Sequence, residues 1–284
     1  MDLFGKSFRK TLCIMGNGFD LAHGMATSWS DFQKWLLENG HSDLVYFWEA
    51  HIDGKANLWK DFEKSLGEYN LESLYEHCTE DIEFDDDHMM RTAFAIEDSP
   101  DFEVMPRKEN LIESFSDWID SIKISDEPLL IDLPIEARYL TFNYTGTLEK
   151  LYGIPESNIL HIHGDVKNPI FGHGNYNSDY DDKSEPIYQI TAKQKIIGEM
   201  NDLYKDVEGI ISSHEDYFSS LSDVKEIIVR GHSYGVIDFP YFKKIQESVK
   251  DDCIWKLGWH NADDKIAAHS LMLSLNIHAE LFHF

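Results

Sequence analysis

The chain has 284 residues, of which 42% are hydrophobic, 13% aromatic and 27% charged, a composition typical of folded globular proteins rather than disordered ones. Its formal net charge of −27 repels phosphate backbones and acidic lipid surfaces, so we expect neither direct nucleic-acid binding nor membrane association. Three cysteines without a C-x-x-C pair exclude a disulfide framework, and no apolar run approaches the roughly 18 residues of a membrane span, which favours a cytoplasmic location.

Short β-like runs alternate with longer helical patterns along the chain. Strands are predicted over Thr11–Met15, Arg138–Phe142, Asn158–His163, Lys225–Arg230, Cys253–Leu257 and Ile277–Phe282. Helices are predicted over Ser30–Glu38, Leu58–Tyr75, Glu109–Ile122, Thr145–Tyr152, Ala192–Phe218, Tyr241–Lys250 and Asp263–Leu275. This alternation predicts an α/β fold, in which helices cover the faces of a parallel sheet.

The first two predicted strands lie about 120 residues apart, far more than the roughly 30 of a simple βαβ unit. We therefore expect one domain over residues 1–284, with a helical insertion at about 30–135 and a second at about 190–222. Segment 76–104 holds eleven acidic residues and one basic residue, Arg91. A solvated loop is favoured there over a divalent-cation site formed by Asp85, Asp86 and Asp87.

A glycine-rich turn follows the first predicted strand. It reads Gly16-Asn17-Gly18-Phe19-Asp20 and continues to His23 and Gly24. Glycines at the carboxyl end of a strand let backbone N–H groups approach a diphosphate, and the start of a helix adds a positive dipole. The full G-x-G-x-x-G spacing is absent, so a tight turn without a ligand is an equal alternative.

The second predicted strand ends in the polar sequence Thr141-Phe142-Asn143-Tyr144-Thr145. Ligands of open α/β sheets bind outside the carboxyl ends of strands, where Asn143 can hold a sugar hydroxyl or a water molecule. Thr145 is placed to cap the following helix. In the alternative, Asn143 caps that helix itself and Tyr144 packs on the core.

The third predicted strand carries His161 and His163, which share one face because side chains alternate along a strand. One of them can act as a general base, since imidazole titrates near neutral pH. With His173, the pair also offers three nitrogens to a metal ion. No carboxylate or cysteine stands at a spacing that completes such a site, so no metal is expected.

The fourth strand leads into Gly231-His232-Ser233-Tyr234-Gly235, which has the G-x-S-x-G form of a serine-hydrolase nucleophile turn. Only 284 − 233 = 51 residues follow Ser233, too few for the acidic and histidine partners together with the rest of such a fold. A second turn that contacts phosphate or ribose suits the same residues better.

As a set, these segments resemble the AbiH family of bacteriophage abortive-infection proteins. The matching segments are 16–32 (GNGFDLAHGMATSWSDF), Trp59 with 61–63, 142–153 (FNYTGTLEKLYG), 161–164 (HIHG), 171–174 (FGHG) and 231–242 (GHSYGVIDFPYF). That family is in turn similar to the sirtuin-like, Rossmann-like NAD-binding fold of antiphage enzymes that consume NAD. Phe142 replaces the sirtuin glutamine and there is no four-cysteine zinc module, so the resemblance does not extend to protein deacetylation.

The resemblance implies roles for individual residues. Asn143 and His163 match the catalytic pair. The candidate nucleotide-contacting set on the two glycine turns is Gly16, Asn17, Gly18, Phe19, Gly231, Ser233 and Asp238. Asp20 and His23, beside the first turn, are second-rank candidates for ribose contacts, and a cap or a core hydrogen bond is the favoured role for both. Gly16 and Gly18 would line the diphosphate, while Ser233 and Asp238 would lie on the later nucleotide-contacting turn.

The implied activity is NAD glycohydrolysis, with NAD as the substrate and no metal. Two alternatives remain, a module that senses NAD or ADP-ribose without catalysis and a serine hydrolase that uses Ser233. The expected partners are a second copy of the chain and a phage-derived or operon-encoded trigger, which we place at the helical insertion and at Ala192–Phe218.

Overall fold

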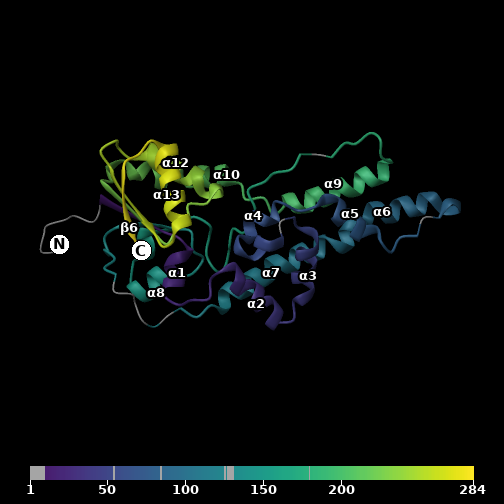
Figure 1. Cartoon of the computed structure of the whole chain (residues 1–284), viewed down its shortest axis with the longest axis horizontal. Coiled ribbons are helices and arrows are strands. Elements are labelled where there is room, and N and C mark those ends of the chain that lie inside the picture. The colour runs from purple at the N-terminus through teal and green to yellow at the C-terminus, as the bar shows by residue number, and fades with distance from the viewer. Residues whose placement is uncertain (1–9, 54, 84, 125, 127–130, 179) are drawn as a thin grey trace, which may run out of the picture. The chain divides into compact units, whose positions relative to one another are not determined.

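The computed structural model describes residues 10–53, 55–83, 85–124, 126, 131–178 and 180–284 (Figure 1). The chain divides into two compact units. Unit 1 comprises Met1–Ser28, Ile119–Ile170 and Asp206–Phe284, and unit 2 comprises Trp29–Trp118 and Phe171–Lys205. Most of the predicted insertion at 30–135 thus belongs to unit 2, whereas the second predicted insertion at 190–222 is shared between both units.

Unit 1 contains a six-stranded sheet in which every neighbouring pair is parallel. Its strands are β1 (Thr11–Met15), β2 (Arg138–Thr141), β3 (Ile159–His161), β4 (Glu226–Arg230), β5 (Ile254–Trp259) and β6 (Ala279–His283). Their order is β3-β2-β1-β4-β5-β6, the strand order of Rossmann folds. The predicted α/β, Rossmann-like fold is therefore confirmed.

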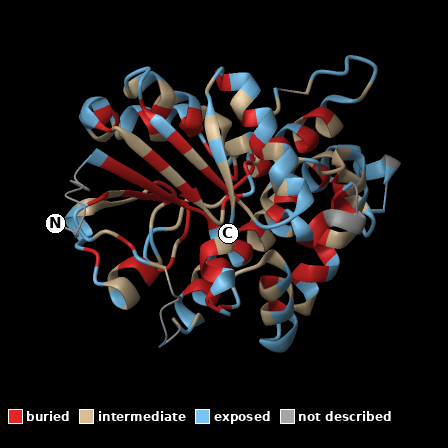
Figure 2. Cartoon of the chain, turned by 60° about the vertical axis from the view of Figure 1, so that its left-hand side comes forward, coloured by how far each residue is buried: buried red, intermediate tan, exposed pale blue. Residues whose placement is uncertain are grey.

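The central strand β1 is buried along its whole length, with helices on both sides of it (Figure 2). Leu12 and Ile14 pack in one hydrophobic cluster with side chains of α10 to α13, while Cys13 and Met15 pack in another with α1 and α8. Figure 1 shows these two groups of helices on opposite faces of the sheet. The helices are α1 (Asn17–Ala22), α8 (Thr147–Tyr152), α10 (Val207–Ser213), α11 (Glu215–Ser219), α12 (Phe239–Ser248) and α13 (Ala262–Leu275).

Unit 2 is helical. Its elements are α2 (Trp29–Glu38), α3 (Ser42–His51), η2 (Lys55–Lys60), α4 (Phe62–Leu66), α5 (Leu71–Thr79), η3 (Asp86–His88), α6 (Met89–Glu103), most of α7 (Met105–Ser121) and α9 (Ile187–Asn201). An aromatic cluster fills its core, made by Trp29, Phe32, Trp59, Phe62, Phe115, Trp118 and Phe171. Phe171 stacks on Phe115 with a 4.4 Å distance between ring centroids.

Three buried lysines tie the helices of unit 2 together. Lys193 pairs with Glu72 and Glu185, Lys205 with Glu63, and Lys108 with Glu199 and Asp202. Glu63 also accepts the backbone N–H of Gly172. The segments around Phe62 and Phe171, part of the family resemblance, thus build the core of unit 2.

Every predicted strand is present, with ends that differ by at most two residues. Two long predicted helices are wrong in extent. The segment predicted as Leu58–Tyr75 breaks into η2, α4 and α5, and the one predicted as Ala192–Phe218 breaks into the last part of α9, α10 and α11. Asn70 and Asp206 cause two of these breaks, because each caps the helix that follows it with its side chain.

The acidic segment 76–104, predicted as a loop, is a loop only between α5 and η3. Residues 89–103 form α6, whose buried residues Thr92, Ile96, Ser99 and Pro100 recur at helical spacing. Asp85 precedes it and accepts hydrogen bonds from the Asp87 N–H and the His88 ring.

Candidate functional site

The loops that follow β1 and β4 meet at the point where the strand order reverses. Gly16 donates its N–H to the Arg230 carbonyl at 3.0 Å, and Gly18 donates to the Gly231 carbonyl at 2.7 Å. A Cβ on Gly16 would lie 2.6 Å from the Gly231 oxygen, and Gly231 itself has a positive φ of 64°. Glycine is therefore required here by close packing of two loops.

These hydrogen bonds engage three N–H groups of the glycine-rich turn, since Phe19 also donates to the Gly16 carbonyl. Phe19 is buried in the core, while Asn17 is exposed and its amide donates to the Thr27 carbonyl. Diphosphate binding by this turn stays a prediction.

Asp20 joins the turn after β1 to the turn after β2. Its buried carboxylate accepts hydrogen bonds from the hydroxyls of Thr145 and Thr147. Burial raises the pKa of Asp20, and the hydrogen bonds from Thr145, Thr147 and the Asn143 side chain oppose this shift. The prediction that Thr145 caps the next helix is wrong, because α8 begins after Gly146 and has no side-chain cap.

The ring of His23 connects α1 to α8 through two hydrogen bonds. One ring nitrogen lies 2.7 Å from the Phe19 carbonyl and the other 2.7 Å from the Tyr152 hydroxyl. Since a carbonyl only accepts, Nδ1 carries the hydrogen and Nε2 of the neutral ring accepts from Tyr152.

Asn143 follows β2 and is 6% exposed. Its backbone N–H donates to the Thr141 hydroxyl, so it does not cap a helix. Its side-chain oxygen, Oδ1, is buried and accepts no hydrogen bond from the described part of the chain. Such an acceptor costs about 1–3 kcal/mol, which a donor from a ligand or a water molecule would recover.

His161 fixes the backbone of Asn143. Its Nδ1 lies 3.0 Å from the Asn143 carbonyl and its Nε2 lies 2.8 Å from Glu149 of α8. Burial disfavours the charged ring, yet hydrogen bonds to Glu149 and to the Asn143 carbonyl raise the pKa of His161. Burial of the Glu149 carboxylate opposes its ionisation, yet the hydrogen bond from His161 lowers the pKa of Glu149. Because both nitrogens face acceptors, this environment favours the imidazolium form of His161.

His163 has different partners from His161, because β3 ends at His161 and strand alternation stops there. Nε2 of His163 lies 3.7 Å from one carboxylate oxygen of Asp238, and Nε2 of His232 lies 3.2 Å from the other. Nδ1 of His232 accepts the Tyr234 N–H, so a neutral His232 carries its hydrogen on Nε2, facing Asp238. One carboxylate thus bridges two imidazoles.

Aromatic rings surround this histidine pair. Phe142 lies edge-on to both His163 and His232, with centroid distances of 5.1 and 4.5 Å, and Tyr241 lies 5.5 Å from His163. Both histidine side chains are at most 6% exposed, whereas Asp238 is 21% exposed. The low polarity around them strengthens the interaction of either imidazole with the carboxylate.

Ser233 is exposed, and among the described hydrogen bonds none joins its hydroxyl to a histidine. In the turn after β4 the strained residues are Gly231 and Tyr234, which have φ values of 64° and 58°. A hydrolase turn requires a serine with a strained backbone and a hydrogen bond to a histidine base, and Ser233 has neither feature among the described contacts.

The residues considered as metal ligands are distributed over both units. His173 belongs to unit 2, where its Nε2 donates to the Met200 carbonyl and burial lowers the pKa of its ring. Among the described residues, no group of three or more His, Cys, Asp or Glu side chains forms a candidate metal centre.

Three of the predicted residues, Asn143, His163 and Asp238, thus lie at the carboxyl edge of one sheet. Asn143 and His163 follow β2 and β3, and Asp238 lies beside His163. His232 and Glu149 were not among the predicted site residues. His232 lies two residues after the end of β4 and just before Ser233, so the sequence could have indicated it, but the G-x-S-x-G pattern drew attention to Ser233 instead. Nothing in the sequence pairs Glu149 with His161, because that contact depends on how α8 packs beside β3.

The described helices include none that is long and apolar enough to cross a bilayer.

No curated protein and no solved structure gives a significant match to the chain. The family model described as "Bacteriophage abortive infection AbiH" matches residues 12–259, which include all of β1 but its first residue, β2 to β5 and the whole of unit 2. The chain therefore belongs to the AbiH family, which implies a role in abortive infection by bacteriophage.

Proposed function

We propose that the chain is an antiphage effector that hydrolyses the nicotinamide glycosidic bond of NAD. The strand order supports this proposal, because sheets with this order bind dinucleotides outside the carboxyl ends of their strands, where the order reverses. Asn143 and His163 follow the neighbouring strands β2 and β3 at that edge.

The observation that carries the proposal is the buried amide oxygen of Asn143, which lacks a donor among the described residues. A ribose hydroxyl or the attacking water would donate a hydrogen bond to it. His161 holds the backbone carbonyl of Asn143 and Asp20 accepts a hydrogen bond from its side chain, so the amide is oriented before a ligand arrives.

In the proposed reaction, the bond between ribose C1′ and the nicotinamide nitrogen breaks, and its electron pair goes to the cationic ring, which leaves neutral. Water attacks the resulting oxocarbenium-like carbon, held in place by Asn143. His163 accepts the proton of that water, and the Asp238 carboxylate stabilises the imidazolium that forms. The products are ADP-ribose, nicotinamide and one proton.

The test is to incubate the purified chain with NAD and to quantify nicotinamide by chromatography. We expect Asn143→Ala and His163→Ala each to reduce release by about 10²-fold or more, the usual contribution of a positioned acid or base. His269→Ala is the matched control, since His269 is an exposed histidine on α13. Thermal unfolding of each variant shows whether the fold is retained.

Tight NAD binding by wild type without nicotinamide release would contradict catalysis and favour a module that senses NAD or ADP-ribose. Equal release by wild type and by both folded variants would remove Asn143 and His163 from the mechanism.

A further inference from the structure

Helix α6 of unit 2 has apolar side chains on two faces. Its inner face, with Thr92, Ile96, Ser99 and Pro100 buried, packs against α5 and α9. Its outer side carries Met90, Phe94 and Phe102, and Met89 is exposed at the first position of the helix, with exposures of 73, 58, 73 and 60% in that order. A helix on the surface of a globular protein is normally polar on its outer side. We call these four exposed residues the α6 face.

The α6 face is one surface rather than four isolated side chains. Phe94 lines a hollow of about 520 Å³ with Met89 and Met90, and also a groove of about 400 Å³ with Phe102 and Ile82. Phe94 is therefore the residue that the two hollows have in common. Contiguous exposed apolar surface of this kind marks interaction sites, whereas scattered apolar residues do not.

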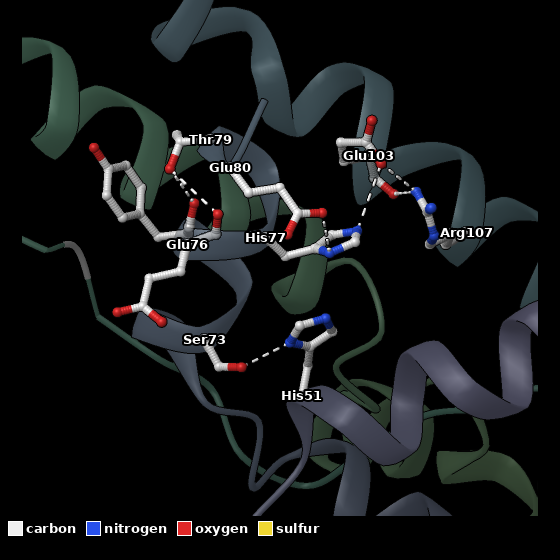
Figure 3. A network of polar contacts seen from close by, with 9 residues as sticks. His51, Ser73, Glu76, His77, Thr79, Glu80, Glu103 and Arg107 are labelled. Atoms are coloured by element: carbon white, nitrogen blue, oxygen red, sulfur yellow. Dashed lines mark hydrogen bonds and ion pairs between the residues drawn. The ribbon is translucent and has the colours of Figure 1, made fainter. Parts of the chain in front are cut away.

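The groove is held by polar contacts between helices (Figure 3). His77 of α5 lies 3.6 Å from Glu103 of α6, and Glu103 pairs at 2.7 Å with Arg107 of α7, whose guanidinium lies over the Phe47 ring. Lys195 of α9 pairs with Asp98 and Asp101 of α6. A partner would therefore meet helices that are already fixed relative to one another, which lowers the entropy cost of binding.

The surroundings of the α6 face are strongly acidic. Segment 76–104 carries eleven acidic residues against one arginine. Asp81, Glu83 and Asp87 are exposed, and no described ion pair engages them with a cation. Since the chain has a net charge of −27, a second copy would bring like charge to this surface. Charge complementarity selects a basic occupant instead.

We propose that the α6 face binds an amphipathic helix of a partner protein, with lysine or arginine flanking an apolar stripe. Phe94 and Phe102 would anchor the stripe, Met89 and Met90 would adapt to its side chains, and the acidic rim would pair with the basic flanks. This docking site does not depend on the proposed chemistry in unit 1.

The test measures binding of a fluorescein-labelled, 18-residue amphipathic helix of leucine and lysine to the full chain by fluorescence anisotropy. We expect the double variant Phe94→Ser and Phe102→Ser to raise the Kd at least about tenfold, because each change removes an aromatic anchor. Leu273→Ser is the matched control, since Leu273 is 83% exposed on α13 of unit 1. It should leave the Kd unchanged.

A second variant tests the rim independently. Replacing Asp81, Glu83 and Asp87 by their amides should weaken binding about tenfold at low salt and flatten its dependence on salt, since fewer charge pairs remain to be screened. Thermal unfolding of both variants should match wild type, because all the substituted side chains are exposed.

Three results would overturn the proposal. The first is an equal Kd for wild type and the Phe94/Phe102 double variant. The second is equally tight binding of a scrambled peptide with the same composition, which would show attraction by charge alone. The third is self-association of wild type that the double variant abolishes, which would make a second copy the occupant.

Discussion

Gly16 and Gly231 lie where the two central loops of the sheet touch, and the space between them decides which residues fit. A methyl group on Gly16 would approach the Gly231 oxygen to 2.6 Å and the His232 Cα to 2.7 Å, both backbone atoms that cannot move alone. The glycine-rich turn thus has a structural requirement that is independent of any nucleotide.

We predict that Gly16→Ala lowers the free energy of unfolding by about 1–3 kcal/mol, the usual cost of overpacking. Chemical denaturation of the purified variant checks this value. Gly235→Ala is the control in the same unit, because a methyl group added there would lie 3.9 Å from its nearest neighbour, the Ser233 hydroxyl, and φ is −58°. Equal destabilisation by both changes would contradict the packing argument.

Asp238 precedes α12, yet its carboxylate does not cap that helix and faces His163 and His232 instead. If it stabilises the protonated form of His163, Asp238→Asn should lower nicotinamide release about 10²-fold. It should also move the acidic limb of the rate profile to lower pH, because the imidazolium loses its counter-charge. A change in rate without a change in the pH profile would leave Asp238 with a structural role only.

The candidate site was predictable only in part. Asn143 could be chosen because it follows a predicted strand and His163 because it ends one, and parallel strands bring their carboxyl ends to one edge. The pairing of His163 with Asp238 and His232 could not be foreseen, since it joins turns about 70 residues apart. The separation of His161 from His163 followed from the early end of β3, which strand alternation does not reveal.

At the scale of elements, the contact between β3 and α8 rests on the ion pair of His161 and Glu149. The folded-state pKa of His161 is raised above its ordinary value of 6.5, so its stabilising contribution is full below that pH and is lost as pH rises through the raised value. The pKa of Glu149 is lowered below 4.5, so its contribution is lost only as pH falls through that lowered value.

We therefore predict that Glu149→Gln lowers the unfolding temperature by roughly 2–4 °C near pH 6, and that the difference from wild type shrinks toward pH 9. Thermal scans of both proteins across this range measure it. Glu280→Gln, a change of an exposed carboxylate on β6, should give no such pH dependence. A deficit for Glu149→Gln that is constant from pH 6 to pH 9 would refute the ion-pair account.

Helix α13 shows a second local signal. Asn261 accepts the Asp264 N–H while Asp264 accepts the Asn261 N–H, a complete capping box. Asn261→Ala should lower the free energy of unfolding by about 1 kcal/mol, whereas Asn261→Ser should retain most of this stabilisation because serine is also a good N-cap residue. Denaturant titration of both variants distinguishes a cap from an exposed asparagine, for which the two changes would be equivalent.

The strands could be predicted because short apolar runs bounded by turns are a local property. The helices of unit 2 were harder, because Trp29, Phe62 and Phe171 meet only after residues far apart in the chain have packed. Helix α6 was missed since its acidic charge suggests a solvated loop, whereas contacts with α5 and α9 hold it as a helix.

At the scale of the whole molecule, the net charge of −27 acts against compactness through self-repulsion. Raising NaCl from about 20 to 200 mM shortens the screening length from roughly 20 to 7 Å, so we predict a higher unfolding temperature at the higher salt. Differential scanning calorimetry checks this, and an unfolding temperature that falls with salt would show that the ion pairs outweigh the repulsion.

The AbiH family and the Rossmann-like strand order together lead us to expect loss of NAD in infected cells. The most direct measurement is mass spectrometry of NAD and nicotinamide in phage-infected cells that express wild type or Asn143→Ala at equal levels. We predict that NAD falls and nicotinamide rises with wild type alone, together with loss of phage yield. Protection against phage by wild type with NAD unchanged would contradict the account.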